Sequence, residues 1–60
     1  MREDWAVVYE SRDYQPCSDR ALVLHSLDIP YEIVRGFDRV LVAVPAPLAE
    51  RAKFELWQYD

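Results

Sequence analysis

The chain has 60 residues and a formal net charge of −4, so it forms one small domain with an acidic balance. Its residues are 52% hydrophobic and 13% aromatic, a composition that argues against an intrinsically disordered segment. So short a chain has no room for a substrate domain, and its basic residues are spread from Arg2 to Lys53 instead of forming a nucleic-acid-binding patch.

Three features of the sequence indicate in which cellular compartment the domain lies. The single cysteine, Cys17, has no partner for an internal disulfide, on which small secreted domains usually depend. The first residues lack the basic-then-apolar order of a signal peptide. The longest apolar run covers residues 40–47, well short of the roughly 20 residues that cross a bilayer. We therefore expect a soluble domain in a reducing, cytosolic setting.

The first half of the chain predicts a strand followed by a helix. Residues 5–9 are aromatic and β-branched, which favours a strand, and the polar residues 10–13 favour a turn. Pro16 suits the first helical position, because the N–H that it lacks has no partner there. Four positions then recur at helical steps of four, three and four residues, the first three of them apolar: Cys17, Ala21, Leu24 and Asp28. They predict an amphipathic helix of about three turns that ends at Ile29–Pro30.

The second half predicts a β-hairpin and a further helix. Residues 31–35 alternate as a strand does, and residues 36–38 form a short reversal in which only Gly36 is free to take a positive φ at low cost. Residues 39–44 are apolar on both faces, as is typical of a central strand, and Pro45 closes it. A final helix starts at Pro47, with its apolar positions at steps of four, four and three: Leu48, Ala52, Leu56 and Tyr59.

The predicted order of elements is β-α-β-β-α. Because the third strand is the most apolar, we place it in the middle of a three-stranded sheet with strand order 1-3-2 and both helices on one face. This is an α+β arrangement, half of a ferredoxin-like fold that lacks its last strand. Residues 1–60 then form a single domain without internal repeats.

No combination of residues indicates catalysis. The only histidine, His25, lies about 10–12 Å along the predicted helix axis from Cys17 and Ser18, too far for a hydrogen bond. Cys17 is expected to pack as a small hydrophobe. Its place in the first helical turn would lower a thiol pKa, which leaves a thiol-sensing protein as a minor hypothesis.

Metal, phosphate and nucleic-acid sites are also not indicated. One cysteine and one histidine provide no metal-binding pair, and Gly36 is the only glycine where a phosphate-binding loop needs several. RNA-binding sheets of the same general fold carry aromatic residues on their central strand, whereas this strand carries Val, Leu and Ala. We therefore predict no catalytic residues, no metal, no cofactor and no nucleic-acid partner.

A surface for a partner is the remaining functional feature. Each face of the first and third predicted strands is apolar, so the sequence leaves open which face is exposed. The simpler interpretation is a small domain with some exposed aliphatic residues. The alternative is a docking surface, for which the candidate residues are Trp5, Val7, Val40 and Val42 in the strands and Phe54 and Trp57 in the last helix.

Four segments of the chain resemble one known family. They are Trp-Ala-Val-Val-Tyr-Glu at 5–10, the helical stretch 17–31 ending in Ile-Pro-Tyr, Val-Ala-Val-Pro at 42–45, and Ala-Glu-Arg-Ala-Lys-Phe-Glu-Leu-Trp-Gln-Tyr at 49–59. Together they resemble the N-terminal cytosolic domain of bacterial rhomboid-type intramembrane serine proteases. The layout is also similar to that of small bacterial domains described as signal-transducing proteins.

The resemblance implies a non-catalytic accessory domain on the cytoplasmic side of the bacterial inner membrane. In that family the catalytic serine and histidine lie on transmembrane helices, with the serine in a Gly-x-Ser-x pattern. This pattern is missing here, so neither His25 nor any serine receives a catalytic role. The implied partner is the transmembrane protease domain of the same polypeptide, which the domain modulates through protein contacts or through weak contacts with the membrane.

Two alternatives accompany this expectation. The chain is either an accessory domain or a free-standing signal-transducing or adaptor module that binds a protein through its exposed sheet face. A missing fourth strand also leaves the edge of the first strand unpaired. We therefore expect a homodimer as a further candidate assembly, formed edge to edge or by exchange of a helix across a hinge near Ile29–Pro30.

Overall fold

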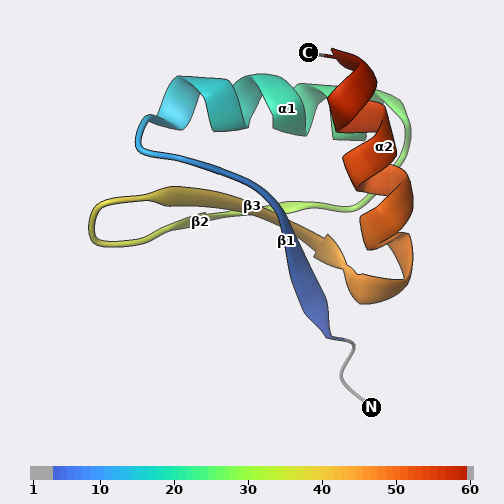
Figure 1. Cartoon of the computed structure of the whole chain (residues 1–60), viewed down its shortest axis with the longest axis horizontal. Helices are drawn as coiled ribbons and strands as arrows, with labels where there is room; N and C mark the ends of the chain where they lie inside the picture. The colour runs from blue at the N-terminus through green and yellow to red at the C-terminus, as the bar shows by residue number, and fades with distance from the viewer. Residues whose placement is uncertain (1–3, 60) are drawn as a thin grey trace.

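The computed structural model describes residues 4–59 (Figure 1). Its elements, in chain order, are β1 (Trp5–Ser11), α1 (Tyr14–Ser26), β2 (Glu32–Arg35), β3 (Val40–Pro45), the 3₁₀ turn η1 (Ala46–Leu48) and α2 (Ala49–Tyr59). The strands form one antiparallel sheet in the order β1-β3-β2. Both helices lie on the same side of this sheet (Figure 1). The α+β fold, the strand order and the one-sided placement of the helices are confirmed.

The middle position of β3 follows from its apolar residues on both faces. Val42 lies opposite Tyr9 of β1 and Ile33 of β2, on the side that faces the helices. Val7 and Ala43 lie opposite one another on the other side. Val7 and Tyr9 point to opposite faces of the sheet because β1 has a bulge at Val8, an extra residue between these two paired positions.

The core lies between the sheet and the two helices. It consists of buried residues from each layer: Cys17, Leu24, Ile29, Val40, Val42, Val44, Ala52 and Leu56. At Ala52 only a methyl group separates the α2 backbone from its neighbours, which allows the helix to pack closely. Leu48, Ala52 and Leu56 follow the predicted stripe, and the side chain predicted to complete it, Tyr59, lies outside the described side chains.

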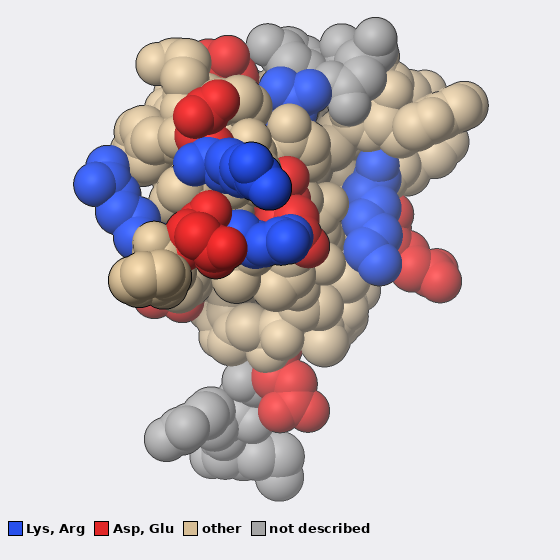
Figure 2. All heavy atoms as spheres, turned by 60° about the vertical axis from the view of Figure 1, so that its left-hand side comes forward, with Lys and Arg blue, Asp and Glu red and all other residues tan. Residues whose placement is uncertain are grey.

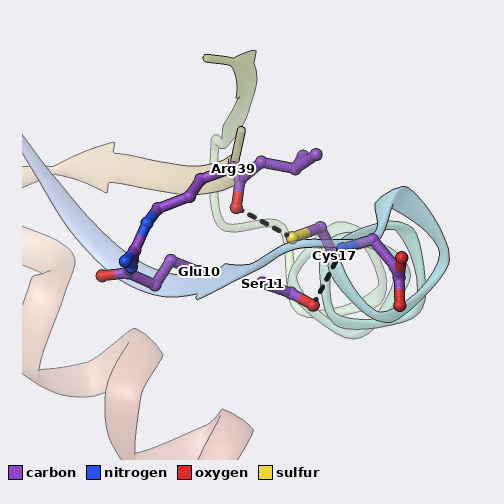
Figure 3. Close-up of polar contacts among 6 residues, drawn as sticks. Glu10, Ser11, Cys17 and Arg39 are labelled. Atoms are coloured by element: carbon purple, nitrogen blue, oxygen red, sulfur yellow. Dashed lines mark hydrogen bonds and ion pairs between the residues drawn. The ribbon is translucent and has the colours of Figure 1, made fainter. Parts of the chain in front are cut away.

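The start of α1 differs from the prediction by two residues. The helix begins at Tyr14, with Asp13 as its N-cap, so Pro16 is the third helical residue and not the first. The first four N–H groups of a helix have no partner within it, so the proline costs no hydrogen bond at this position either. The Asp13 N–H donates to Ser11 Oγ at 3.2 Å, which tightens the turn from β1 (Figure 3).

The end of α1 is a Schellman motif. The Ile29 N–H donates to the Leu24 carbonyl at 3.0 Å, and the Asp28 N–H donates to the His25 carbonyl at 3.1 Å. This geometry requires a positive φ at Asp28, which has φ 59°. Asp28 therefore terminates the helix instead of continuing its stripe, which corrects the helical position predicted for it.

The hairpin between β2 and β3 also corrects an expectation. Gly36 does not have a positive φ; among the described residues only Asp28 does. The Gly36 N–H donates to the Arg39 carbonyl at 2.7 Å, and a Cβ on Gly36 would lie 3.3 Å from that oxygen. Glycine is thus suited to this position by its small size. Pro45 ends β3 opposite Trp5, and Ala46 adds one more backbone hydrogen bond, to the Asp4 carbonyl at 2.7 Å.

Candidate interaction surface

One face of the sheet carries no helix. Strand pairing and the alternation of side chains place nine residues on this face, which we call the open face: Trp5, Val7, Glu10, Glu32, Val34, Arg39, Leu41, Ala43 and Pro45. Each of the three strands contributes to the open face, because antiparallel pairing aligns these residues across β1, β3 and β2. Both α1 and α2 lie on the opposite side (Figure 1).

The open face is apolar at its centre. Trp5 and Val7 are each 46% exposed and Val34 is 42% exposed, which are large fractions for apolar side chains on a sheet. Ala43 is buried between its cross-strand neighbours Val7 and Glu32, although no helix covers it. The surface of residues 4–59 has no pocket, so this face offers a partner a shallow apolar area and no enclosed site.

At one end of the open face, a positive and a negative side chain neutralise each other. Arg39 forms an ion pair with Glu10 across β1 and β3, with both side chains about half exposed (Figure 3). Glu32, on the other outer strand, forms no ion pair with any residue between 4 and 59. The open face therefore has a net negative charge.

Other arginines lie on the helix side of the sheet. The Arg20 guanidinium carbon is 4.5 Å from the centre of the Tyr9 ring, and that of Arg35 is 4.5 Å from the centre of the Tyr14 ring. Around the hairpin end of the molecule, acidic and basic side chains are interleaved without an extended area of one sign (Figure 2). This view shows no basic patch of the kind that binds nucleic acid, in line with the scattered basic residues of the sequence.

Two of the six residues predicted to form the interaction surface are in the core. Val42 is fully buried and Val40 is 8% exposed, because both point toward the helices. Their prediction as surface residues was wrong, since Trp5 and Val7 share a face with Leu41 and Ala43 instead. One side of β3 carries three valines and the other a leucine and an alanine, so both sides are apolar and the strand alone did not indicate which side is buried.

Sequence reasoning also missed three apolar residues that the structure leaves exposed or half-buried. Val34 and Leu41 complete the open face but were not predicted to belong to it. Phe37, at the tip of the β2–β3 hairpin, is fully exposed and was interpreted only as part of the turn. A hydrophobic residue in a short polar reversal is a signal that could have identified it.

Phe54 and Trp57 form a separate surface. Both are exposed, Trp57 at 75%, and both lie on α2. Because α2 packs on the opposite side of the sheet from the open face, the structure does not join these residues to Trp5 and Val7 (Figure 1). The six predicted residues therefore divide into two exposed pairs and one buried pair.

Cys17 and His25 are not brought together. Cys17 is fully buried, and its thiol donates to the Val40 carbonyl at 3.3 Å (Figure 3). Burial raises the pKa of this thiol above its ordinary value, and the opposing effects of Arg20 and of a backbone hydrogen bond from Ser11 are smaller. His25 is exposed and packs edge-on against Tyr31, with ring centres 6.4 Å apart. Residues 4–59 contain no group of side chains able to hold a metal ion.

Comparison with known proteins identifies no relative. No family model, curated protein or solved structure matches the chain. Neither α1 nor α2 is long and apolar enough to cross a membrane.

Proposed function

We propose that this chain is a non-catalytic interaction domain that binds a protein partner through the open face of its sheet. The observation that supports this is the grouping of Trp5, Val7 and Val34 on one uncovered face, around the nearly buried Ala43. Single exposed apolar side chains are ordinary on a soluble domain. A contiguous group of them beside charged residues is typical of surfaces that dock other proteins.

The face is a better docking surface than either edge of the sheet. β1 has a bulge at Val8, and a bulge on an edge strand disrupts the regular row of hydrogen-bonding groups that another strand would need. β2 has four residues, with Glu32 and Arg35 at its ends, and short charged strands resist pairing in the same way. The edge-to-edge or exchanged homodimer stays a prediction, and these features favour docking on the face.

The partner that we propose first is the membrane-embedded domain of a rhomboid-type serine protease. Its support is the sequence resemblance over residues 5–59, which implies a cytosolic domain attached to such a protease. In this version the domain modulates the protease from the cytoplasmic side, and the catalytic residues lie outside the 60 residues. The second candidate is a free-standing adaptor, favoured by the fact that the open face needs no attached domain to be accessible.

The coding sequence downstream of residue 60 separates the two versions. The accessory version predicts hydrophobic spans in the same reading frame, one of them with a Gly-x-Ser-x pattern and another with a histidine. A stop codon within a few residues would contradict that version and favour the free-standing adaptor. Neither result bears on the open face, which requires its own test.

Site-specific photo-cross-linking tests the open face. A photo-reactive amino acid replaces Val34 on the open face or, as a matched control, Leu22, which is exposed on α1. In cells that contain the natural partner, we expect position 34 to form a cross-link with one protein, identified by mass spectrometry, and position 22 to form none. Equal cross-linking from both positions, or none from position 34, would contradict docking on the open face.

A further inference from the structure

We infer that the element docking on the open face is an amphipathic α-helix whose apolar stripe is flanked by lysine or arginine. This inference rests on the proposed function and specifies the chemistry of the partner. It is carried by the dimensions of the sheet, by the exposed apolar area and by the distribution of charge around Glu32.

The width of the sheet suits one helix. Neighbouring strands lie about 4.8 Å apart, so three strands form a face about 14 Å wide. An α-helix with its side chains is about 10–12 Å across, so one helix laid along the face covers it. The docked helix would add a third layer, and helices on both faces of a sheet are one of the stable layer arrangements of small domains.

A second copy of the chain fits less well, because the exposed apolar area is small. A stable dimer of standard size buries about 800 Å² of each partner, of which about 450 Å² is apolar. Trp5, the largest apolar side chain on the open face, is 46% exposed. At that exposure it offers about 115 Å² of the roughly 250 Å² of a large aromatic side chain. Even three side chains of that size would supply only about 350 Å².

Charge also favours a basic partner. The chain has a formal net charge of −4, so a second copy or an anionic lipid surface would bring charge of the same sign. Arg39 is paired with Glu10, whereas Glu32 has no ion-pair partner among residues 4–59. Since Glu32 lies beside Val34 and opposite Ala43, a lysine or arginine next to an apolar stripe could reach it.

The same chemistry occurs in cytoplasmic segments of membrane proteins. Such segments are rich in lysine and arginine close to the membrane spans. A basic amphipathic helix adjoining a span would therefore meet both requirements of the open face. A helix of this kind would be present if the partner is the membrane-embedded protease domain. A soluble partner that carries such a helix would meet the same requirements.

Two synthetic peptides test the inference. Each has about 14 residues with leucines at helical spacing i, i+3, i+4 and i+7, and the residues flanking this stripe are lysine in one peptide and glutamate in the other. Each is titrated into the isotope-labelled domain and followed by two-dimensional NMR. We expect the lysine peptide to shift the amides of Val7, Val34 and Leu41 and to bind at least about tenfold more tightly than the glutamate peptide.

A pair of charge reversals provides the matched control. Glu32→Lys should abolish or invert the preference for the lysine peptide. Glu50→Lys makes the same charge change on α2 and should leave the preference in place. A preference that falls equally in both variants would overturn the assignment to Glu32, since it would reflect net charge alone.

The remaining outcomes separate this inference from the proposed function. Equal binding of both peptides at the open face would overturn the basic character of the partner and leave docking on the face intact. Shifts confined to Phe54 and Trp57 would contradict both, because they would place docking on α2. If neither peptide binds, the inference fails, and the cross-linking at position 34 decides the proposed function by itself.

Discussion

Cys17 illustrates how position in the fold determines the chemistry of one side chain. A cysteine in the first turn of a helix is expected to have a lowered thiol pKa, because the helix N-terminus favours negative charge. In this fold α1 packs over β3, the thiol is fully buried, and desolvation of the thiolate outweighs the effects that lower its pKa. The neutral thiol then acts as a small core residue that donates to the Val40 carbonyl.

The raised thiol pKa predicts a loss of stability at alkaline pH. The neutral thiol stabilises the fold fully below its ordinary pKa of about 9, and this contribution is lost as pH rises through the higher pKa of the folded state. Urea unfolding of the native chain should therefore show a larger decrease in stability between about pH 8 and pH 10 than unfolding of Cys17→Ala. Equal decreases in the two proteins would contradict this account, as would rapid labelling of the folded protein by a thiol reagent.

Asp28 provides a prediction of the opposite sign. A non-glycine residue at positive φ is strained, and the Schellman motif requires this conformation at position 28. Asp28→Gly should raise the free energy of unfolding by about 0.5 kcal/mol, less than the full strain because glycine gains freedom in the unfolded chain. Asp28→Ala should lower it by about 0.5–1 kcal/mol, since alanine tolerates this region less well than aspartate. Thermal unfolding measures both changes, and a destabilised Asp28→Gly would refute the motif.

Gly36 was free to adopt a positive φ and does not, whereas Asp28, which the helical spacing placed in the helix, adopts one. Glycine permits a positive φ but does not require it, so Gly36 in a short reversal indicated only where the chain turns. At Asp28 the conformation is imposed by the packing of Leu24 and Ile29 into the core at either side of the helix end. That requirement is tertiary, and it cannot be read from the helical spacing of the residues.

At the scale of elements, β3 contributes most to the core. Val42→Ala removes two methyl groups from a fully buried site and should cost about 2 kcal/mol. Val34→Ala, in β2 on the open face, should change the free energy of unfolding by less than about 0.5 kcal/mol. A domain of this length has a total stability of about 3–9 kcal/mol, so the difference should be clear in urea unfolding. Equal costs at the two positions would mean that the open face is covered.

The type and order of the elements could be predicted because periodicity and prolines mark them. The strands, the helices and the central place of β3 all follow from which residues are apolar and at what spacing. The open face could not be predicted, since both sides of β1 and β3 are apolar and the bulge at Val8 changes the side to which β1 residues point. Only the packed helices determine that Val40 and Val42 are inside and that Leu41 is outside.

For the whole molecule, net charge opposes self-association through the open face. The sequence isoelectric point is about 4.7, so the repulsion that follows from the charge of −4 at neutral pH disappears near that pH. Proteins close to zero net charge associate through whatever apolar surface they expose. We therefore expect sedimentation velocity to show larger species near pH 4.7 than at pH 7, and added salt at pH 7 to act in the same direction by screening the charges.

Two substitutions test whether the open face or the exposed apolar surface of α2 causes this association. If association occurs through the open face, Val7→Ser should reduce it near pH 4.7 without changing the net charge, because it places a polar group beside Ala43. Trp57→Ser, on α2, should then leave it unchanged. The reverse result would show that association occurs through the exposed surface of α2. Both substitutions alter exposed side chains, so the fold is retained in each variant and the comparison concerns the surfaces alone.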